Sequence, residues 1–130
     1  MRKLILFIAL ISCGLAVGCS KDGEVKTFLT KFESVTKEMT KKIESGDIDG
    51  AKKHFEENKV DLKTGFDSFK NAREIQVSAE TKKELESSVM SNMKALSAAA
   101  SKAAIGAAGD KAKVETLQAL LKDYANLFKM

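Results

Sequence analysis

The feature that constrains this chain most is a recurring spacing of apolar residues, three or four positions apart, in 130 residues without a single proline. That spacing puts the apolar side chains on one face of an α-helix. Proline would interrupt the backbone hydrogen bonds of such a helix, and its absence leaves most of the chain free to be helical. We interpret the one stretch with strand character, Glu74–Val77, as a turn. Four segments carry the helical pattern, namely 24–45, 48–73, 79–107 and 111–129.

Short connections separate these segments and carry helix-ending and helix-starting residues. Gly46 suits the end of the first helix, and Asp47 suits the start of the second. Ser78 is placed to cap the third helix, and Gly106–Asp110 separates it from the fourth. Helices joined by short loops pack antiparallel to their neighbours. The sequence therefore predicts an all-α fold, an antiparallel up-down-up-down four-helix bundle spanning residues 24–130.

Aligning the apolar faces of consecutive helices, each taken as the neighbour of the next, predicts the layers of the core. Large apolar side chains meet at the same level of the bundle in two of these layers. One layer contains Met39, Phe55, Leu96 and Leu121, and the other contains Phe32, Leu62, Val89 and Phe128.

Between the two layers the same alignment places Val35, Asn58, Asn92 and Tyr124. One hypothesis is a polar core layer, in which the two amides bond each other, the Tyr124 hydroxyl or water, because unpaired buried amides are costly. Such a layer would fix the register of the helices or line a small ligand cavity. The alternative is that one or both asparagines lie on the flank of the bundle and are solvated.

The N-terminus has the organisation of a secretion signal. Arg2 and Lys3 precede the apolar run Leu4–Ile11, and no charged residue follows until Lys21. A short basic region followed by an apolar core of this length is typical of a signal peptide, whereas a membrane-spanning helix requires about 20 strongly apolar residues. We therefore expect the N-terminal segment to be removed.

The sequence LAVGC, Leu15–Cys19, resembles the lipobox of bacterial lipoproteins. With Leu15 as the aliphatic residue the box is one residue longer than the commonest spacing, and with Ala16 the spacing is standard. The resemblance implies transfer of diacylglycerol to the Cys19 thiol and N-acylation in many bacteria. It also implies cleavage between Gly18 and Cys19, which removes residues 1–18 as the signal peptide. Two acyl chains give stable anchoring where one does not. Residues 19–23 would then form a lipidated tether.

The cysteines and the residue after Cys19 agree with that interpretation. The only other cysteine, Cys13, lies in the apolar signal, so the processed chain has no disulfide partner for Cys19. Ser20 stands where aspartate would favour the inner membrane, and by resemblance to enterobacterial sorting this favours the periplasmic side of the outer membrane. The alternatives are an ordinary signal peptide with an incidental cysteine and an uncleaved anchor.

Residues that carry chemistry are sparse. His54 is the only histidine, and no thiols or clustered carboxylates accompany it, so we expect no metal site and no catalytic residues. Asp47–Gly50 resembles the start of a calcium loop but lacks the later ligands. The net charge of +4 falls by two when Arg2 and Lys3 leave. Because the remaining lysines are scattered among acidic residues, nucleic acid is not an expected partner.

The expected function is that of a lipid-anchored, non-catalytic envelope protein whose bundle binds an envelope protein or a small ligand. Ala95–Gly109, rich in alanine and glycine, offers a smooth surface for a helix or ligand. The alternative is a cofactor-binding bundle, similar in architecture to periplasmic b- and c′-type cytochromes. The chain lacks their CxxCH motif and C-terminal histidine, so no cofactor is expected. Haem could be held axially only by His54 together with Met39, Met90 or Met93.

Overall fold

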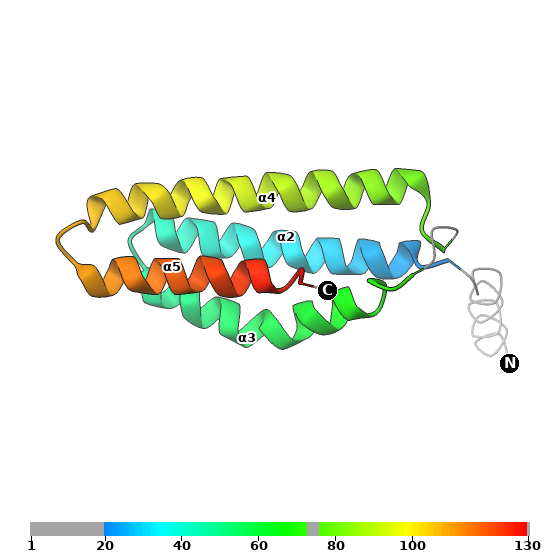
Figure 1. Ribbon diagram of the computed structural model, residues 1–130, viewed down its shortest axis with the longest axis horizontal. Helices are drawn as coiled ribbons and strands as arrows, with labels where there is room; N and C mark the ends of the chain where they lie inside the picture. Colours follow the sequence, from blue (N-terminus) through cyan, green and yellow to red (C-terminus); the bar gives the residue numbers. More distant parts are fainter. Residues whose placement is uncertain (1–19, 73–75, 130) are drawn as a thin grey trace, which may run out of the picture.

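The computed structural model describes residues 20–72 and 76–129, and within these ranges the secondary structure is helical, with no strand. The described helices are α2 (Asp22–Glu44), α3 (Ile48–Asp67), α4 (Ala79–Gly106) and α5 (Lys111–Asn126). They lie side by side along one long axis (Figure 1). The predicted all-α four-helix bundle is confirmed. In this part of the chain no helix combines the length and the hydrophobicity that crossing a bilayer demands.

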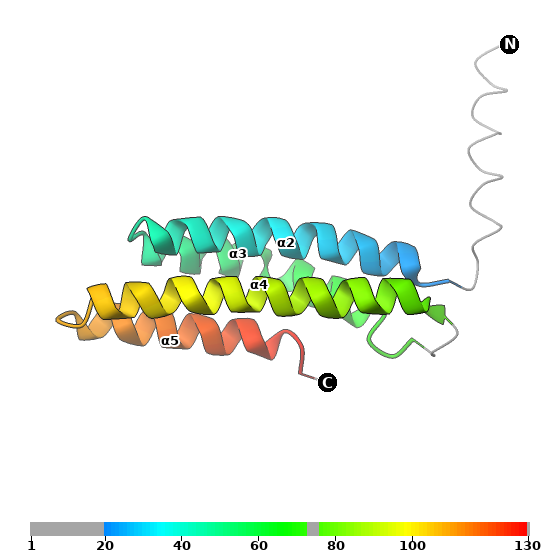
Figure 2. The same ribbon diagram turned by 90° about the horizontal axis from the view of Figure 1, so that it is seen from above.

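The chain reverses direction from each helix to the next, as predicted (Figure 1). Helix α2 packs closely against both α3 and α4, and α5 packs less extensively against α3 and α4. The order around the bundle is therefore α2, α3, α5, α4. Two antiparallel hairpins lie next to each other, so that α2 runs parallel to α4 and α3 runs parallel to α5 (Figure 2).

This order corrects one assumption that was made when the apolar faces were aligned, namely that each helix packs against the next helix in the chain. Helices α3 and α4 are not a closely packed pair, because the residues just before α4 bond to the start of α2. There the Lys21 N–H donates to the Gln76 carbonyl at 2.7 Å, and the Ser78 N–H donates to the Asp22 carboxylate at 2.9 Å. These bonds place the start of α4 against the start of α2.

The parallel register of α2 and α4 is nearly the same at two levels of the bundle. Asp22 pairs with Ser78, 56 residues later, and further along the Ser88 hydroxyl donates to Glu33, 55 residues earlier. A constant separation in sequence is what two helices running in the same direction require, since both rise 1.5 Å per residue.

The core lies around α2, the most central helix. All eight residues of the two predicted layers belong to the core or pack against it. Five of them are buried, whereas Val89, Leu121 and Phe128 are partly buried. Sequence periodicity therefore identified the apolar faces correctly, although it did not give the order of the helices around the bundle.

An aromatic cluster fills the end of the core nearest the N-terminus. Phe28 contacts four other phenylalanine rings at centroid distances of 5.4–6.3 Å. Gly65 makes room for it, since a Cβ at that position would lie 3.3 Å from Cδ2 of Phe28. The rings around Phe28 are Phe32, Phe66, Phe69 and Phe128.

Helix α3 was predicted to continue to residue 73 but ends at Asp67. The Ser68 hydroxyl donates to the Gly65 carbonyl at 2.6 Å, and the chain then turns so that Phe69 is buried in the aromatic cluster. Burying a phenylalanine side chain is worth about 1.5–3 kcal/mol. The free energy gained by burying Phe69 offsets the loss of the last helical turn that was predicted for α3.

The other helix ends follow the capping residues in the sequence. Side-chain oxygens of Asp47, Ser78 and Asp110 accept hydrogen bonds from the N–H groups of Gly50, Thr81 and Lys113 at 2.9–3.2 Å. Each bond satisfies a donor in the first turn of a helix that has no partner within that helix. Gly46 has a φ of 85°, the left-handed conformation expected of glycine after a helix.

Candidate functional site

The proposed lipidation and cleavage residues, Cys19 and Gly18, lie outside the described residues. Ser20, the first described residue, is exposed and stands two residues before α2 begins. The chain therefore enters the bundle at the end where α2 and α4 begin and where α3 ends (Figure 1). We call this the tether end, and the opposite end, with the two short hairpin loops, the distal end.

Tyr124 lies in the core, as predicted, but its partner is Thr36. The two hydroxyl oxygens are 2.7 Å apart, and both residues are 1% exposed. Burial raises the pKa of Tyr124, and the Thr36 hydrogen bond opposes this shift only in part. Sequence reasoning missed Thr36, although it falls one residue after Val35 on the apolar face of α2.

Asn58 and Asn92 do not join Tyr124 in a polar layer, and that hypothesis was wrong. Each is half-buried and donates to a backbone carbonyl of its own helix at 2.8 Å, Asn58 to His54 and Asn92 to Ser88. Asn58 lines a groove between α2 and α3, and Asn92 lines a groove between α2 and α4. The two amides therefore lie in separate grooves on different sides of α2 and form no shared layer.

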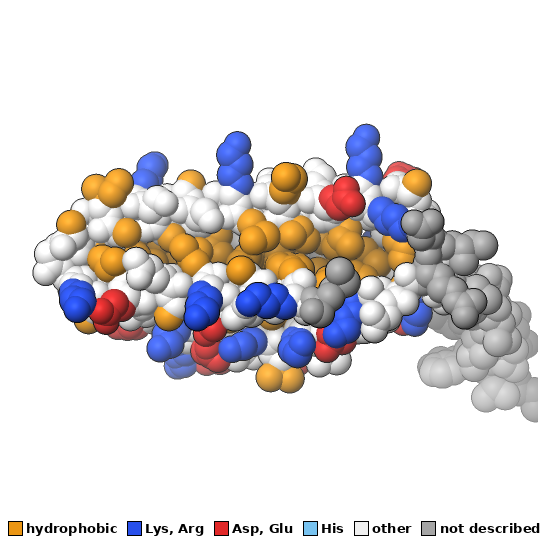
Figure 3. All heavy atoms as spheres, viewed as in Figure 1, with side chains coloured by type: hydrophobic (Ala, Val, Ile, Leu, Met, Phe, Trp, Pro, Cys, Tyr) orange, Lys and Arg blue, Asp and Glu red, His pale blue; other side chains and the backbone are white. Residues whose placement is uncertain are grey.

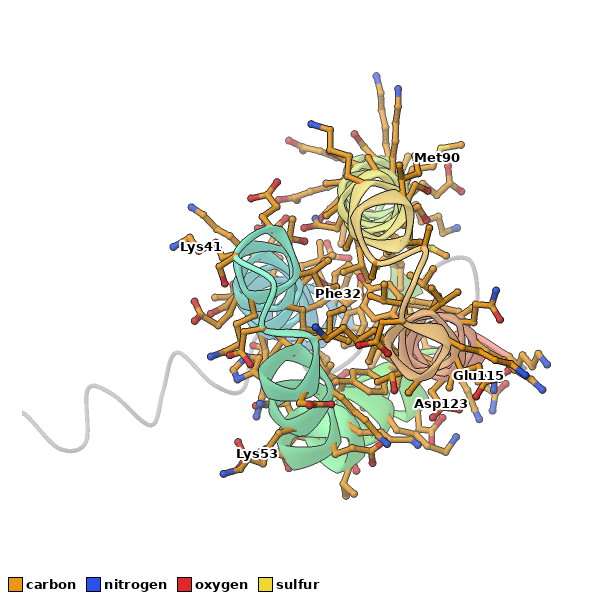
Figure 4. All side chains as sticks on the ribbon, turned by 90° about the vertical axis from the view of Figure 1, so that its left-hand side faces the viewer. Phe32, Lys41, Lys53, Met90, Glu115 and Asp123 are labelled. Atoms are coloured by element: carbon orange, nitrogen blue, oxygen red, sulfur yellow. The ribbon has the colours of Figure 1, made fainter. Side chains whose placement is uncertain are left out.

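A cavity of about 530 Å³ lies at the distal end, where α2 and α4 end and α3 and α5 begin. Figure 4 views the bundle from this end. Alanine and glycine residues from the Ala-rich segment leave the space that larger side chains would fill. The residues of that segment in the lining are Ala99, Lys102, Ala103, Gly106 and Ala107.

The distal cavity combines apolar walls with charged groups. Ile43 and Ile48, both buried, contribute apolar surface from α2 and α3. Lys102 and Lys113 contribute two ammonium groups, and Glu44 one carboxylate. Pockets that bind small molecules have volumes of about 300–1,000 Å³ and mix mostly apolar walls with a few polar groups. The cavity therefore suits a small ligand, or a protruding side chain of a partner, with an apolar body and a charged group.

The outer surface carries interspersed charges of both signs (Figure 3). Exposed ion pairs link neighbouring helices, among them Lys31 with Asp61 and Lys59 with Asp123. Side chains such as Lys41, Lys53 and Glu115 point away from the bundle (Figure 4). Pairs of this kind contribute little stability each, and they are typical of a solvated surface.

The residues considered as haem ligands do not gather at the distal cavity. His54 is half-buried and lines the groove between α2 and α3, Met39 is wholly buried, and Met90 is 74% exposed on α4 (Figure 4). Within residues 20–72 and 76–129, no three His, Cys, Asp or Glu side chains are grouped so that they could hold a metal ion. In comparisons with known proteins, no protein-family model, curated protein or solved structure matches the chain.

Proposed function

We propose that this protein is a lipid-anchored, non-catalytic protein of the bacterial cell envelope, whose helical bundle is a binding module in the periplasm. Cys19 carries the lipid, and residues 20 and 21 connect it to the bundle, because Asp22 and Gly23, which were expected to belong to the tether, already lie in α2. The distal cavity is the binding site. Delivery to the periplasmic side of the outer membrane follows from Ser20.

The observation that carries this proposal is the position of the two ends of the bundle. The lipobox-like sequence ends one residue before Ser20, which lies at the tether end, whereas the cavity lined by the Ala-rich segment lies at the distal end. Helix α4 has 28 residues. At 1.5 Å per residue it separates the two ends by about 40 Å. An anchor at one end thus presents the cavity away from the membrane surface.

The anchoring part is tested by fractionation of cells that produce the full chain. Wild-type protein should pellet with membranes and should incorporate labelled fatty acid, because two acyl chains hold it stably. Cys19→Ser should lose the label and remain uncleaved at this site, and Ser20→Asp should move the protein from outer to inner membrane. Equal labelling of wild type and Cys19→Ser would contradict the proposal.

The binding part is tested at Ala103, which lines the distal cavity. A photoreactive residue at Lys102, also in the lining, should form a discrete crosslinked adduct in cells. Ala103→Phe should abolish that adduct by filling the cavity, whereas Ala98→Phe, on an exposed position of the same helix, should leave it unchanged. An adduct that is insensitive to Ala103→Phe would contradict binding in the cavity.

A small-ligand-binding bundle is the second candidate, and the volume and mixed lining of the distal cavity favour it. In that case native mass spectrometry of the purified protein should show a bound small molecule, which Ala103→Phe removes. Haem is a poorer fit, because His54 does not line the cavity. A haem absorption band that disappears in His54→Ala would favour the cytochrome-like alternative instead.

A further inference from the structure

Apolar side chains form a band along the face between α4 and α5 (Figure 3). The band is open at the tether end, because α5 has 16 residues and α4 has 28, so that α5 stops short of the first turns of α4 (Figure 1). In that region Leu85 and Phe66 remain only partly buried although both pack against the core.

A groove of about 190 Å³ lies at this place, and we call it the tether-end groove. Lys70 and Lys82 complete its lining, and the Lys70 ammonium group is 2.8 Å from the Asp67 carboxylate. Six of the eight residues that line the groove are apolar, so the groove favours an apolar occupant. Its apolar lining is formed by Val25, Phe66, Phe69, Ala72, Val77 and Leu85.

The groove lies directly beside the point where the tether enters the bundle. The Lys21 N–H bonds to the carbonyl of Gln76, whose neighbour Val77 lines the groove, and Val25 lines it one helical turn after Lys21. Cys19 is two residues before Lys21, and two residues span at most about 7 Å. A group attached to Cys19 therefore starts within about 7 Å of Lys21, which bonds to the residue next to the groove-lining Val77.

We propose that the tether-end groove holds an acyl chain of the lipid on Cys19; this inference rests on the proposed lipid anchor. A whole helix, with a diameter of about 10–12 Å, is too wide for a space of this volume, whereas a single acyl chain is slender and wholly apolar. An acyl chain outside a bilayer is stabilised when it packs against an apolar surface that removes it from water. The bundle thus shields part of its own anchor whenever the protein is not inserted in a membrane.

The test uses the full chain, produced in cells that are fed a fatty acid with a photoactivatable diazirine group. The lipidated protein is purified, detergent is removed, and the sample is illuminated and digested for mass spectrometry. The expected result is a crosslink between the Cys19 lipid and peptides that contain Val77 or Leu85. Label on Cys19 with crosslinks confined to residues 20–23 overturns the groove but leaves the anchor intact. Absence of label on Cys19 overturns both.

Two variants separate groove occupancy from chance contact. Leu85→Trp fills the groove from a partly buried position and should reduce the crosslink to background, whereas Val60→Trp, at a position 72% exposed on α3, should leave it at the wild-type level. Circular dichroism of both variants checks that the bundle is intact. A crosslink that survives Leu85→Trp in an intact bundle overturns the proposal.

Mixing isotopically heavy and light protein before illumination identifies the source of the acyl chain. Crosslinks within one copy support the proposal. Crosslinks between heavy and light copies overturn it in favour of exchange between molecules. A groove peptide that carries a phospholipid mass overturns it in favour of a free membrane lipid.

Discussion

The hydroxyl groups of Thr36 and Tyr124 satisfy each other inside an otherwise apolar core. In the described part of the chain no buried side-chain nitrogen or oxygen is left without a partner. A lone buried hydroxyl is costly, so this pair specifies that α5 faces α2 at this level. Thr36 lies on the apolar face of α2, but sequence alone could not pair it with Tyr124, because that pairing depends on the order of the helices.

Thr36→Val keeps the shape of the side chain and leaves the buried Tyr124 hydroxyl without its partner. We expect the free energy of unfolding to fall by about 1–3 kcal/mol, measured by urea unfolding. Adding Tyr124→Phe removes the unsatisfied group, so the double variant should be more stable than the sum of the single effects predicts. Strict additivity of the two effects would show that the hydroxyls do not interact.

Asp22 joins the starts of α2 and α4 through its bond to the Ser78 N–H, and that bond lowers its pKa from 3.8. Because the pKa is lower in the folded state, the stabilisation is complete above about pH 4 and is lost as the pH falls through the folded-state pKa. Asp22→Asn should therefore be less stable than wild type at neutral pH and should approach it in acid, as followed by urea unfolding across pH. A difference that is constant with pH would contradict a role for the charge.

At the scale of elements, the starts of the helices follow local chemistry closely, and their ends follow it less well. Asp47 and Ser78 were predicted as caps and do begin α3 and α4, because a cap bonds to N–H groups only a few residues away. Asp110 caps α5 without having been predicted to, and α2 begins without a side-chain cap. The end of α3 depended instead on Phe69, which leaves the helix to reach a distant aromatic cluster. Periodicity places a residue on a face, but it does not show whether the chain bends to bury it.

Gly65 brings α3 close to α2, and a Cβ at this position would lie 3.3 Å from the Phe28 ring, which is closer than ordinary contact. Alanine is favoured over glycine in a helix by about 1 kcal/mol, but overpacking a core costs about 1–3 kcal/mol. Phe28 is enclosed by other rings, so we expect Gly65→Ala to destabilise the protein by about 1 kcal/mol in thermal or urea unfolding. Gly106→Ala, where a Cβ meets no atom within 4 Å, is the control and should not destabilise. Stabilisation by Gly65→Ala would refute the close contact.

At the scale of the whole molecule, the sequence predicted four helices of alternating direction but not which helices touch. The connection after α3 spans residues 68–78, and this length allows it to cross the end of the bundle. The bond from the Ser78 N–H to the Asp22 carboxylate then holds the start of α4 beside the start of α2. Assuming that consecutive helices are neighbours placed α4 beside α3, and the polar layer of Asn58 and Asn92 failed for that reason. From the sequence we expected only an Ala-rich surface at the place of the distal cavity. The cavity itself could not be predicted, because its volume arises where the ends of four helices converge.

The neighbour order can be measured by pulsed electron paramagnetic resonance. Spin labels are attached to cysteine pairs in a chain with serine at positions 13 and 19. Labels at Lys37 and Ala95, which line one groove between α2 and α4, should be closer than labels at Glu56 on α3 and Ala95. The reverse order of distances would place α4 beside α3 and contradict the described arrangement.

The lipid on Cys19 is the part of the proposed function on which anchoring, orientation and the tether-end groove all depend. Its most direct measurement is the intact mass of the protein extracted from membranes with detergent. We predict a chain that begins at Cys19 and carries diacylglycerol, with a further acyl chain in hosts that N-acylate. A chain with an unmodified Cys19, or one cut at another bond or not cut at all, would contradict the proposal.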